Sequence, residues 1–507
     1  MVSYVRSSGI NGIKGFEVVC ECDLSNGLPM FDVVGLPDTS VRESRERVRA
    51  AIRNCGFDFP LKRITVNLAP ADRRKEGPIY DLPIMLSILL ASGQINAVPQ
   101  KAVFVGELSL DGRLRPVNGV LPMALHALER GTGSVFVPAE NAREAAFAGG
   151  ISVYGASHVN EVLDHLCGRN PIELTGQPSV DDANMAQLSN FSEVRGQQHV
   201  KRAMEIAAAG GHNIILSGPP GSGKSMLANR LPSILPDMTM AECVESTNIY
   251  SVAGLTGRER PIINVRPFRA PHHSVSANAL SGGGTRPKPG EISLAHNGVL
   301  FLDELPEFRR DALETLRQPL EEGRVTISRV YGRITMPSRF ILCAAMNPCK
   351  CGWYGQPGDR CTCAPNAVRQ YLARISGPLL DRIDLHVDVP AVGYDELTGS
   401  EPSESSADIR ARVNTARERQ RVRTGETGVV NAYLTHSQII EYCELGEAEN
   451  ALMKNAFERF RMTARSHDKV LKVARTIADL TGAERIEVSH IAEALQYRGL
   501  DRMLTEE

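Results

Sequence analysis

The feature that most constrains this chain is a glycine-rich octapeptide, Gly218-Pro-Pro-Gly-Ser-Gly-Lys224-Ser225. It follows an apolar, strand-like run at 213–216 and precedes a helical run at 226–231. In this context the pattern is typical of a phosphate-binding loop, because its glycines let backbone N–H groups surround phosphate oxygens at a helix N-terminus. We expect Lys224 to reach the β- and γ-phosphates of ATP and the Ser225 hydroxyl to bind Mg²⁺. The rest of the cradle would be Gly218, Pro219, Pro220, Gly221, Ser222 and Gly223.

Polar residues follow two other apolar runs. Asp303 and Glu304 come directly after the apolar residues 299–302, and Asn347 ends the apolar run 340–346. A carboxylate at the end of a buried strand can hold Mg²⁺, and a glutamate beside it can orient and polarise an attacking water. We therefore predict that Asp303 binds the metal and Glu304 the lytic water, with Asn347 holding that water from the far side of the γ-phosphate.

The length of 507 residues exceeds what one hydrophobic core supports, so several domains are expected. In residues 1–168, strand-like runs at 31–34, 64–68 and 102–105 alternate with helical patterns such as 41–53, which predicts an α/β or α+β domain. Residues 169–190 are polar and aperiodic, as in a linker. The nucleotide motifs fall in a second α/β domain at 191–392, and residues 393–507 are expected to form a helical domain.

Composition limits the class of protein. Hydrophobic residues make up 42% and charged residues 23%, as in ordinary globular domains. The N-terminus has no apolar signal segment, and the longest apolar run, 82–91, is too short to span a bilayer. We therefore expect a cytoplasmic protein without membrane contact, whose eleven cysteines are reduced thiols or metal ligands. With a net charge of −2, binding to a polyanion would depend on local clusters of Lys and Arg.

Four longer segments make the motifs specific: Gly196-Gln-Gln-His-Val-Lys-Arg-Ala, Phe268-Arg-Ala-Pro-His-His-Ser, Pro289-Gly-Glu-Ile-Ser-Leu-Ala-His-Asn-Gly and Ile375-Ser-Gly-Pro-Leu-Leu-Asp-Arg-Ile-Asp-Leu. With them, the chain resembles the magnesium-chelatase-like branch of AAA+ ATPases and, more closely, the ComM/YifB competence proteins, over essentially its whole length. The resemblance implies a central AAA+ ATPase domain, a C-terminal helical lid and assembly into a homo-hexamer.

The same resemblance gives roles to two arginines. Arg382 stands where related rings place the finger that reaches the γ-phosphate of the neighbouring subunit, and Arg374 is the alternative. An always-charged, planar donor suits the charge that develops there. Arg465 matches the second sensor arginine of the lid, and Arg475 is its competitor. Either could instead be an ordinary arginine on a helix surface.

The N-terminal region resembles the proteolytic domain of Lon, in the runs that start at Val103 and Val135. That domain uses a Ser–Lys dyad. In this chain Ile79 stands at the position of the serine and Leu121 at that of the lysine, and neither side chain can act as a nucleophile or a base. We therefore expect a Lon-like α/β domain that lacks proteolytic chemistry and serves binding or assembly.

Four cysteines lie close together in the sequence as two C-x-C pairs: Cys349, Cys351, Cys361 and Cys363. Such a set can supply the four thiolates of a structural Zn²⁺ site. C-x-C spacing is tighter than the usual C-x₂-C, so reduced free thiols and a redox or disulfide role are the alternatives. Because the loop directly follows Asn347, a bound metal would brace the strand before it.

Two segments carry clustered basic residues that could line the channel of a ring. The segment 266–288 has no acidic residue, and 321–333 resembles a hairpin with Arg324, Arg329 and Arg333. The basic residues of the first segment are Arg266, Arg269, His272, His273, Arg286 and Lys288. Basic loops along a channel suit contact with nucleic-acid phosphates. A solvated loop or an inter-subunit contact is the alternative.

Three functions fit these observations. The resemblance favours a DNA motor, a helicase or branch-migration enzyme in recombination or natural transformation, acting on single-stranded or branched DNA. A metal-insertion chaperone of the chelatase type, acting on a protein partner, is the second hypothesis. A Lon-like protease is the third, and the replacement of both dyad residues argues against it.

Overall fold

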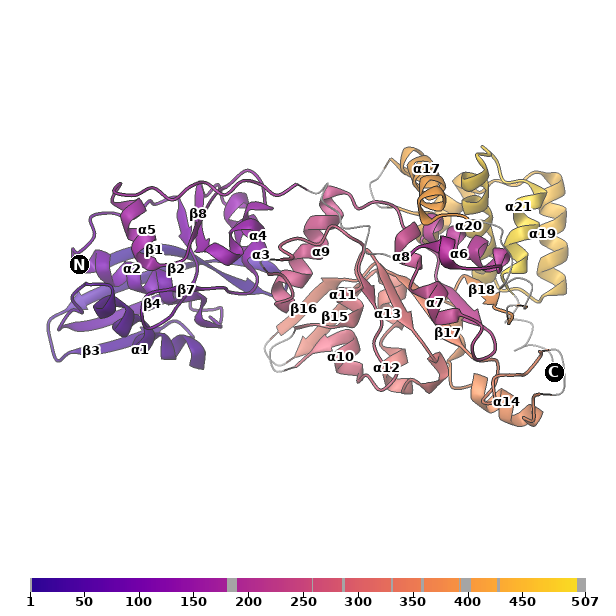
Figure 1. Ribbon diagram of the computed structural model, residues 1–507, viewed down its shortest axis with the longest axis horizontal. Helices are drawn as coiled ribbons and strands as arrows, with labels where there is room; N and C mark the ends of the chain where they lie inside the picture. Colours follow the sequence, from indigo (N-terminus) through magenta and orange to yellow (C-terminus); the bar gives the residue numbers. More distant parts are fainter. Residues whose placement is uncertain are drawn as a thin grey trace. The chain divides into compact units, whose positions relative to one another are not determined.

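The computed structural model describes residues 2–179, 189–257, 259–284, 288–329, 332–356, 360–391, 393, 403–425 and 429–498 (Figure 1). The chain divides into two compact units. The first comprises Met1–Asp182 together with Met240–Asn264, and the second comprises Ala183–Thr239 together with Val265–Glu507. Among the described helices, none combines the length and apolar character that a membrane span requires.

The first unit is built on a mixed seven-stranded sheet in the order β3-β4-β2-β1-β5-β8-β9. Its strands are β1 (Val2–Asn11), β2 (Lys14–Ser25), β3 (Met30–Val34), β4 (Arg63–Ala69), β5 (Ala102–Phe104), β8 (Ser134–Pro138) and β9 (Ser152–Ala156). The helices are α1 (Thr39–Asn54), α2 (Asp81–Ala91), α3 (Val120–Glu129), α4 (Ala142–Ala146) and α5 (Val159–Leu166). The three strands and the helix predicted from sequence correspond to β3, β4, β5 and α1. The apolar run at 82–91 is α2, which is buried on nearly every side.

The segment 240–264 differs from the sequence-based division, which placed it inside the domain at 191–392. Its helix α9 (Met240–Ala253) packs on α3 and belongs to the first unit. The buried carboxylate of Glu144 explains this attachment, because it accepts hydrogen bonds from the hydroxyls of Ser251 and Thr256 as well as from the backbone N–H of Leu121. A buried carboxylate requires such partners, and Ser251 and Thr256 lie more than a hundred positions along the chain.

The second unit contains a five-stranded parallel sheet in the order β11-β14-β17-β10-β18. The strands are β10 (Ile214–Ser217), β11 (Phe268–Arg269), β14 (Val299–Leu302), β17 (Ile341–Met346) and β18 (Leu385–Asp388). The inner strands are short, fully buried and almost wholly apolar, as expected for a parallel sheet covered on both faces. Helices α6 (Gln198–Gly210) and α7 (Lys224–Ala228) flank β10, and α13 (Arg317–Glu322) leads into the hairpin β15 (Arg324–Arg329) and β16 (Gly332–Pro337).

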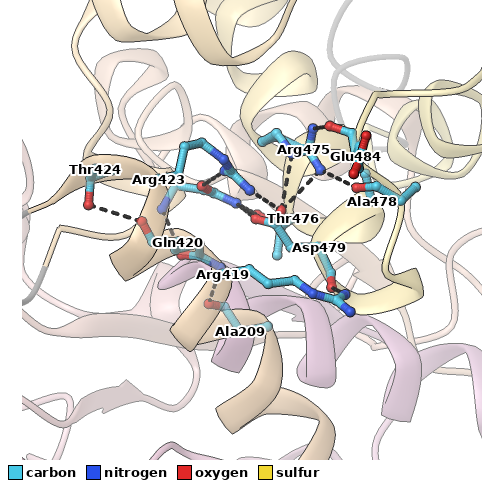
Figure 2. Close-up of polar contacts among 12 residues, drawn as sticks. Ala209, Arg419, Gln420, Arg423, Thr424, Arg475, Thr476, Ala478, Asp479 and Glu484 are labelled. Atoms are coloured by element: carbon cyan, nitrogen blue, oxygen red, sulfur yellow. Dashed lines mark hydrogen bonds and ion pairs between the residues drawn. The ribbon is translucent and has the colours of Figure 1, made fainter.

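The C-terminal part of this unit is helical, as predicted. It consists of α17 (Ser406–Thr424), α18 (His436–Tyr442), α19 (Glu447–Arg459), α20 (Ala464–Thr481) and α21 (Val488–Gln496). Asp479 on α20 is buried and pairs with Arg423 and Arg475 (Figure 2). It also accepts a hydrogen bond from the side chain of Asn431. This buried network ties α17 to α20, and the side chain of Gln420 joins α17 to the carbonyl of Ala209 at the end of α6.

Candidate nucleotide site

The predicted nucleotide residues meet at the carboxyl edge of the parallel sheet. The phosphate-binding loop follows β10, Asp303 and Glu304 follow β14, and Asn347 follows β17, which lies between those two strands. Loops at the carboxyl ends of parallel strands commonly form ligand sites, since the strand order brings together segments distant in sequence. The sheet order therefore explains why these three motifs share one site.

The phosphate-binding loop has the backbone that its glycines allow. Gly221 and Gly223 have φ values of 77° and 88°, a conformation unfavourable for residues with a Cβ. Lys224 begins α7 and is only 8% exposed; its ammonium group donates to the carbonyls of Gly218 and Pro219 at 2.8 and 2.9 Å. Burial lowers the pKa of Lys224, and the Asp303 carboxylate opposes that shift. The ammonium group is thus held inside the loop that would surround the phosphates.

The residues predicted to bind Mg²⁺ lie in contact. The hydroxyl of Ser225 donates to a carboxylate oxygen of Asp303 over 2.6 Å, and the other Asp303 oxygen accepts from the backbone N–H of Glu304 at 2.9 Å. A hydroxyl beside a carboxylate is the hard oxygen donor set that Mg²⁺ prefers, together with waters and phosphates. The two residues therefore fit the predicted ion.

Asn347 lies beside the lysine of the loop. Its side-chain oxygen accepts a hydrogen bond from the Lys224 ammonium group at 3.2 Å. The contact follows from the pairing of β17 with β10, and the role of Asn347 toward the lytic water stays a prediction.

Glu304 adopts a left-handed backbone conformation with φ of 53°. Such a conformation is unusual for a residue with a side chain and concentrates at functional sites. The Glu304 carboxylate is 55% exposed and lies 3.3 Å from the Nδ1 atom of His273. His273 belongs to the Phe268–Ser274 segment, which carried the family resemblance and which the sequence placed in a channel-lining loop rather than in the nucleotide site. Its contact with Glu304 could not be predicted from the sequence, because the two residues lie in different segments that the fold brings together.

The two arginines assigned through the family resemblance share one partner. Arg382 lies 2.5 Å from a carboxylate oxygen of Glu321 on α13, and Arg465, at the start of α20, lies 3.5 Å from the other oxygen. The alternative finger, Arg374, is exposed and pairs with Glu307 at 2.9 Å. Within the chain, therefore, Arg382 and Arg465 both contact the carboxylate of Glu321.

Arg475, the alternative to Arg465, has a structural environment. It is 2% exposed, pairs with Asp479 at 3.0 Å and donates to the carbonyls of Ala483 and Glu484 (Figure 2). Arg465, by contrast, is 55% exposed. The geometry favours Arg465 as the arginine available to a ligand, and its role stays a prediction.

Three of the basic residues predicted for the channel have partners within the fold, and one of them, Arg324, pairs with Glu322 at 3.0 Å. Arg269, on β11, forms a bidentate pair with Glu291 at 2.6 and 2.8 Å, and Arg266 donates to the carbonyls of Pro236, Asp237 and Asn297. Both therefore have structural partners, which the sequence did not show because those partners lie 22 to 31 positions away. Arg286 and the side chain of Arg329 lie outside the described residues, whereas Arg333 on β16 is exposed.

The four clustered cysteines converge. Their sulfur atoms all lie within 4.8 Å of one another, and Cys349 is buried while the other three are partly exposed. All eleven cysteines of the chain are free thiols. Four thiolates in this arrangement could hold a tetrahedral Zn²⁺.

Comparison with known sequences assigns the chain to a family. The pattern of the magnesium chelatase subunit ChlI matches residues 190–397, with further ChlI patterns at 20–141 and, for its C-terminal part, at 403–498. The competence protein ComM of Haemophilus influenzae is 44% identical over 99% of this chain and 98% of that protein. The chain belongs to the ComM/YifB family of magnesium-chelatase-like AAA-type ATPases. YifB of Escherichia coli strain K12, also of the ComM/YifB family, is 43% identical over 99% of this chain and 98% of its own length.

The ComM/YifB N-terminal unit also shows similarity to Lon. The Lon protease of Brucella suis is 29% identical over 167 residues, which cover 30% of this chain and 20% of that protein. The two residues predicted to stand at the positions of the Ser–Lys dyad are apolar and in the core, with Ile79 at 6% and Leu121 at 0% exposure. At both positions, therefore, the chain has packing residues without nucleophilic or basic chemistry.

Proposed function

We propose that this chain hydrolyses ATP as a homo-hexameric ring and couples the cycle to movement along DNA, as a helicase or branch-migration motor. The observation that carries the ATPase part is the convergence of Lys224, Ser225, Asp303 and Asn347 at one sheet edge. The DNA part is supported by the name of its relative, a competence protein, since competence is the uptake of DNA.

In this proposal the protein residues divide the work of hydrolysis. Lys224 and the N–H groups of the loop bind the β- and γ-phosphates, while Ser225 and Asp303 would hold Mg²⁺, which neutralises phosphate charge. Glu304 orients the attacking water and accepts its proton, and Asn347 holds that water from the other side. Arg382 and Arg465 supply charge to the transition state when subunits assemble.

The hairpin β15–β16 is the proposed DNA contact. Arg329 and Arg333 flank its turn, since Arg329 pairs with Gly332 and Ser328 with Arg333 in the strand register. Basic side chains at the tip of a hairpin can follow a phosphate backbone without reading its bases. We base the DNA proposal on Arg329 and Arg333, because Arg266 and Arg269 are used within the fold and Arg324 pairs with Glu322.

The test is ATPase activity with and without single-stranded, duplex and branched DNA. We expect stimulation of the wild type and its loss in R329A/R333A, with basal turnover retained. The double variant K454A/R459A, which removes the same charge from exposed positions on α19, serves as the control. Each lost phosphate contact should also reduce the slope of log K against log salt by about 0.7 to 0.9. A wild-type rate indifferent to every DNA form would reject the motor.

A chelatase-type chaperone is the second candidate, favoured by the match to the magnesium chelatase subunit over 190–397. It predicts ATPase activity that ignores DNA and responds to a protein partner. The DNA-stimulation assay therefore separates the two functions.

A further inference from the structure

The four-cysteine loop has sulfur positions that fit one metal ion. Cys349 lies 3.3 Å from Cys351 and 3.9 Å from Cys361, and Cys351 lies 3.7 Å from Cys361, measured between sulfur atoms. Four sulfurs around one Zn²⁺ at about 2.3 Å would be about 3.8 Å apart in a tetrahedron. A disulfide needs about 2.05 Å, which none of these distances approaches. An iron–sulfur cluster would spread the thiolates further, because sulfide ions lie between its irons.

Backbone N–H groups in the loop donate hydrogen bonds to three of the four cysteine sulfurs. The N–H groups of Trp353, Cys363 and Cys351 face the sulfurs of Cys351, Cys361 and Cys363 respectively. The guanidinium of Arg360 lies over the Trp353 ring at 4.7 Å. Hydrogen bonds to coordinated sulfur orient the ligands and reduce their charge, as outer partners do in metal sites generally.

The loop has no regular structure that would hold the cysteines together by itself. Over 349–356 and 360–364 the described backbone contains neither helix nor strand. Three of the four thiols are partly exposed, so packing in the core does not account for their convergence. A segment of this kind is commonly ordered by a metal or a disulfide, and the thiols are free.

This loop also touches the phosphate-binding loop. Gly352, between the two C-x-C pairs, is buried and has φ of 85°, and a Cβ added there would overlap the ring of Pro220. At its start the loop continues directly from Asn347, whose side chain accepts a hydrogen bond from Lys224. The cysteine loop therefore contacts the nucleotide site from two sides.

We propose that Cys349, Cys351, Cys361 and Cys363 bind one Zn²⁺ through four thiolates and that the metal-bound loop holds the phosphate-binding loop in place through the contact between Gly352 and Pro220. Binding releases the thiol protons, so the site is a folding element as well as a ligand set. The zinc sets nucleotide affinity without touching the nucleotide.

The first experiment measures metal in the full chain, purified without chelators or metal-affinity resin, by inductively coupled plasma mass spectrometry. We expect about one zinc per chain in the wild type and almost none in C361S/C363S. The double variant C55S/C167S removes two thiols outside the cluster and should keep its zinc. Absence of metal from the wild type, or unchanged zinc in C361S/C363S, overturns the metal site.

If C361S/C363S fails to fold, the wild type still decides the question. Titration with an organomercurial in the presence of a zinc indicator should release about one zinc as the thiolates are captured. Substitution by Co²⁺ should give the charge-transfer and ligand-field absorption of a tetrahedral thiolate site. Mercurial titration without zinc release contradicts the proposal.

The second experiment tests whether the metal-bound loop holds the phosphate-binding loop in place, by measuring the binding of a fluorescent ATP analogue. G352A keeps all four thiols, so it should retain zinc but weaken nucleotide binding roughly fivefold or more, the lower end of ordinary coupling between sites. G355A is the matched control, since Gly355 has a similar φ of 73° in the same loop and open space around its Cβ. Equal affinity of G352A and the wild type for the ATP analogue would show that the zinc-bound loop does not hold the phosphate-binding loop. Metal content and nucleotide affinity do not depend on DNA, so this proposal and the DNA motor fail separately.

Discussion

Lys224 and Glu304 have different roles in the proposed cycle, so their loss should differ in effect. Lys224 is held among the carbonyls of the phosphate-binding loop, and K224A should weaken ATP binding and abolish turnover. E304Q keeps that loop intact and should bind ATP normally while losing about 10²- to 10⁴-fold in kcat. Equilibrium nucleotide binding and steady-state turnover separate the two. An E304Q enzyme with more than about a tenth of wild-type kcat would contradict the assignment of Glu304.

His273 should act as a positioning residue for Glu304. Its ring nitrogen lies 3.3 Å from the carboxylate, and removing the ring would leave the Glu304 carboxylate without this contact. We expect H273A to lower kcat about 10- to 100-fold with little change in nucleotide affinity. H436A is the control, since the His436 ring is 74% exposed and contacts Asp468 instead. Similar kcat values for H273A and H436A would show that His273 does not position Glu304.

At the scale of elements, the loop that carries Arg382 is anchored to the helical region. Lys469 on α20 donates to the carbonyls of Asp381 and Ile383, on either side of Arg382, and pairs with Asp384 at 3.4 Å. His212 contacts the same carboxylate at 3.2 Å. Burial alone would raise the pKa of Asp384, but Lys469 and His212 outweigh it and hold that pKa well below the ordinary value.

This anchor gives a pH-dependent prediction. Because the folded pKa of Asp384 is depressed, its contribution is complete above the unfolded pKa of about 3.9 and is lost as the pH falls below it. D384N leaves Lys469 without its charge partner and should lower stability by about 3 to 5 kcal/mol at pH 7. Thermal unfolding from pH 7 to pH 3 should show this deficit shrinking only below about pH 4. D381N, which changes an exposed carboxylate three positions away, should match the wild type throughout.

The sequence predicted the elements whose signals are local. The phosphate-binding loop and the strands β10, β14 and β17 were found because a motif and short apolar runs specify them within a few residues. The attachment of 240–264 to the first unit could not be found this way, because it depends on Glu144, about a hundred positions earlier. The pairing of Arg269 with Glu291 and the contact of His273 with Glu304 were missed for the same reason.

At the scale of the whole molecule, the net charge of −2 means that attraction to DNA must come from local clusters of Lys and Arg. The proposed ring would supply this by repeating the β15–β16 hairpin in each subunit. Assembly would also change the partner of Arg382. Within one chain, the Glu321 carboxylate pairs with Arg382 and offsets its charge. In the proposed ring, Arg382 would exchange Glu321 for the nucleotide of the neighbouring subunit, and its contribution would then depend on a second copy of the chain.

Mixing two inactive variants tests this dependence. R382A subunits keep an intact phosphate-binding loop, and K224A subunits keep an intact Arg382, so a mixed ring contains some sites with both residues supplied by different chains. We expect partial recovery of ATPase activity in the mixture, because an arginine finger supplied by a neighbour can raise kcat by about 10³- to 10⁵-fold. R374A mixed with K224A is the control, since Arg374 pairs with Glu307 and should retain activity alone. No recovery, at concentrations where light scattering shows assembly, would mean that Arg382 acts within its own subunit.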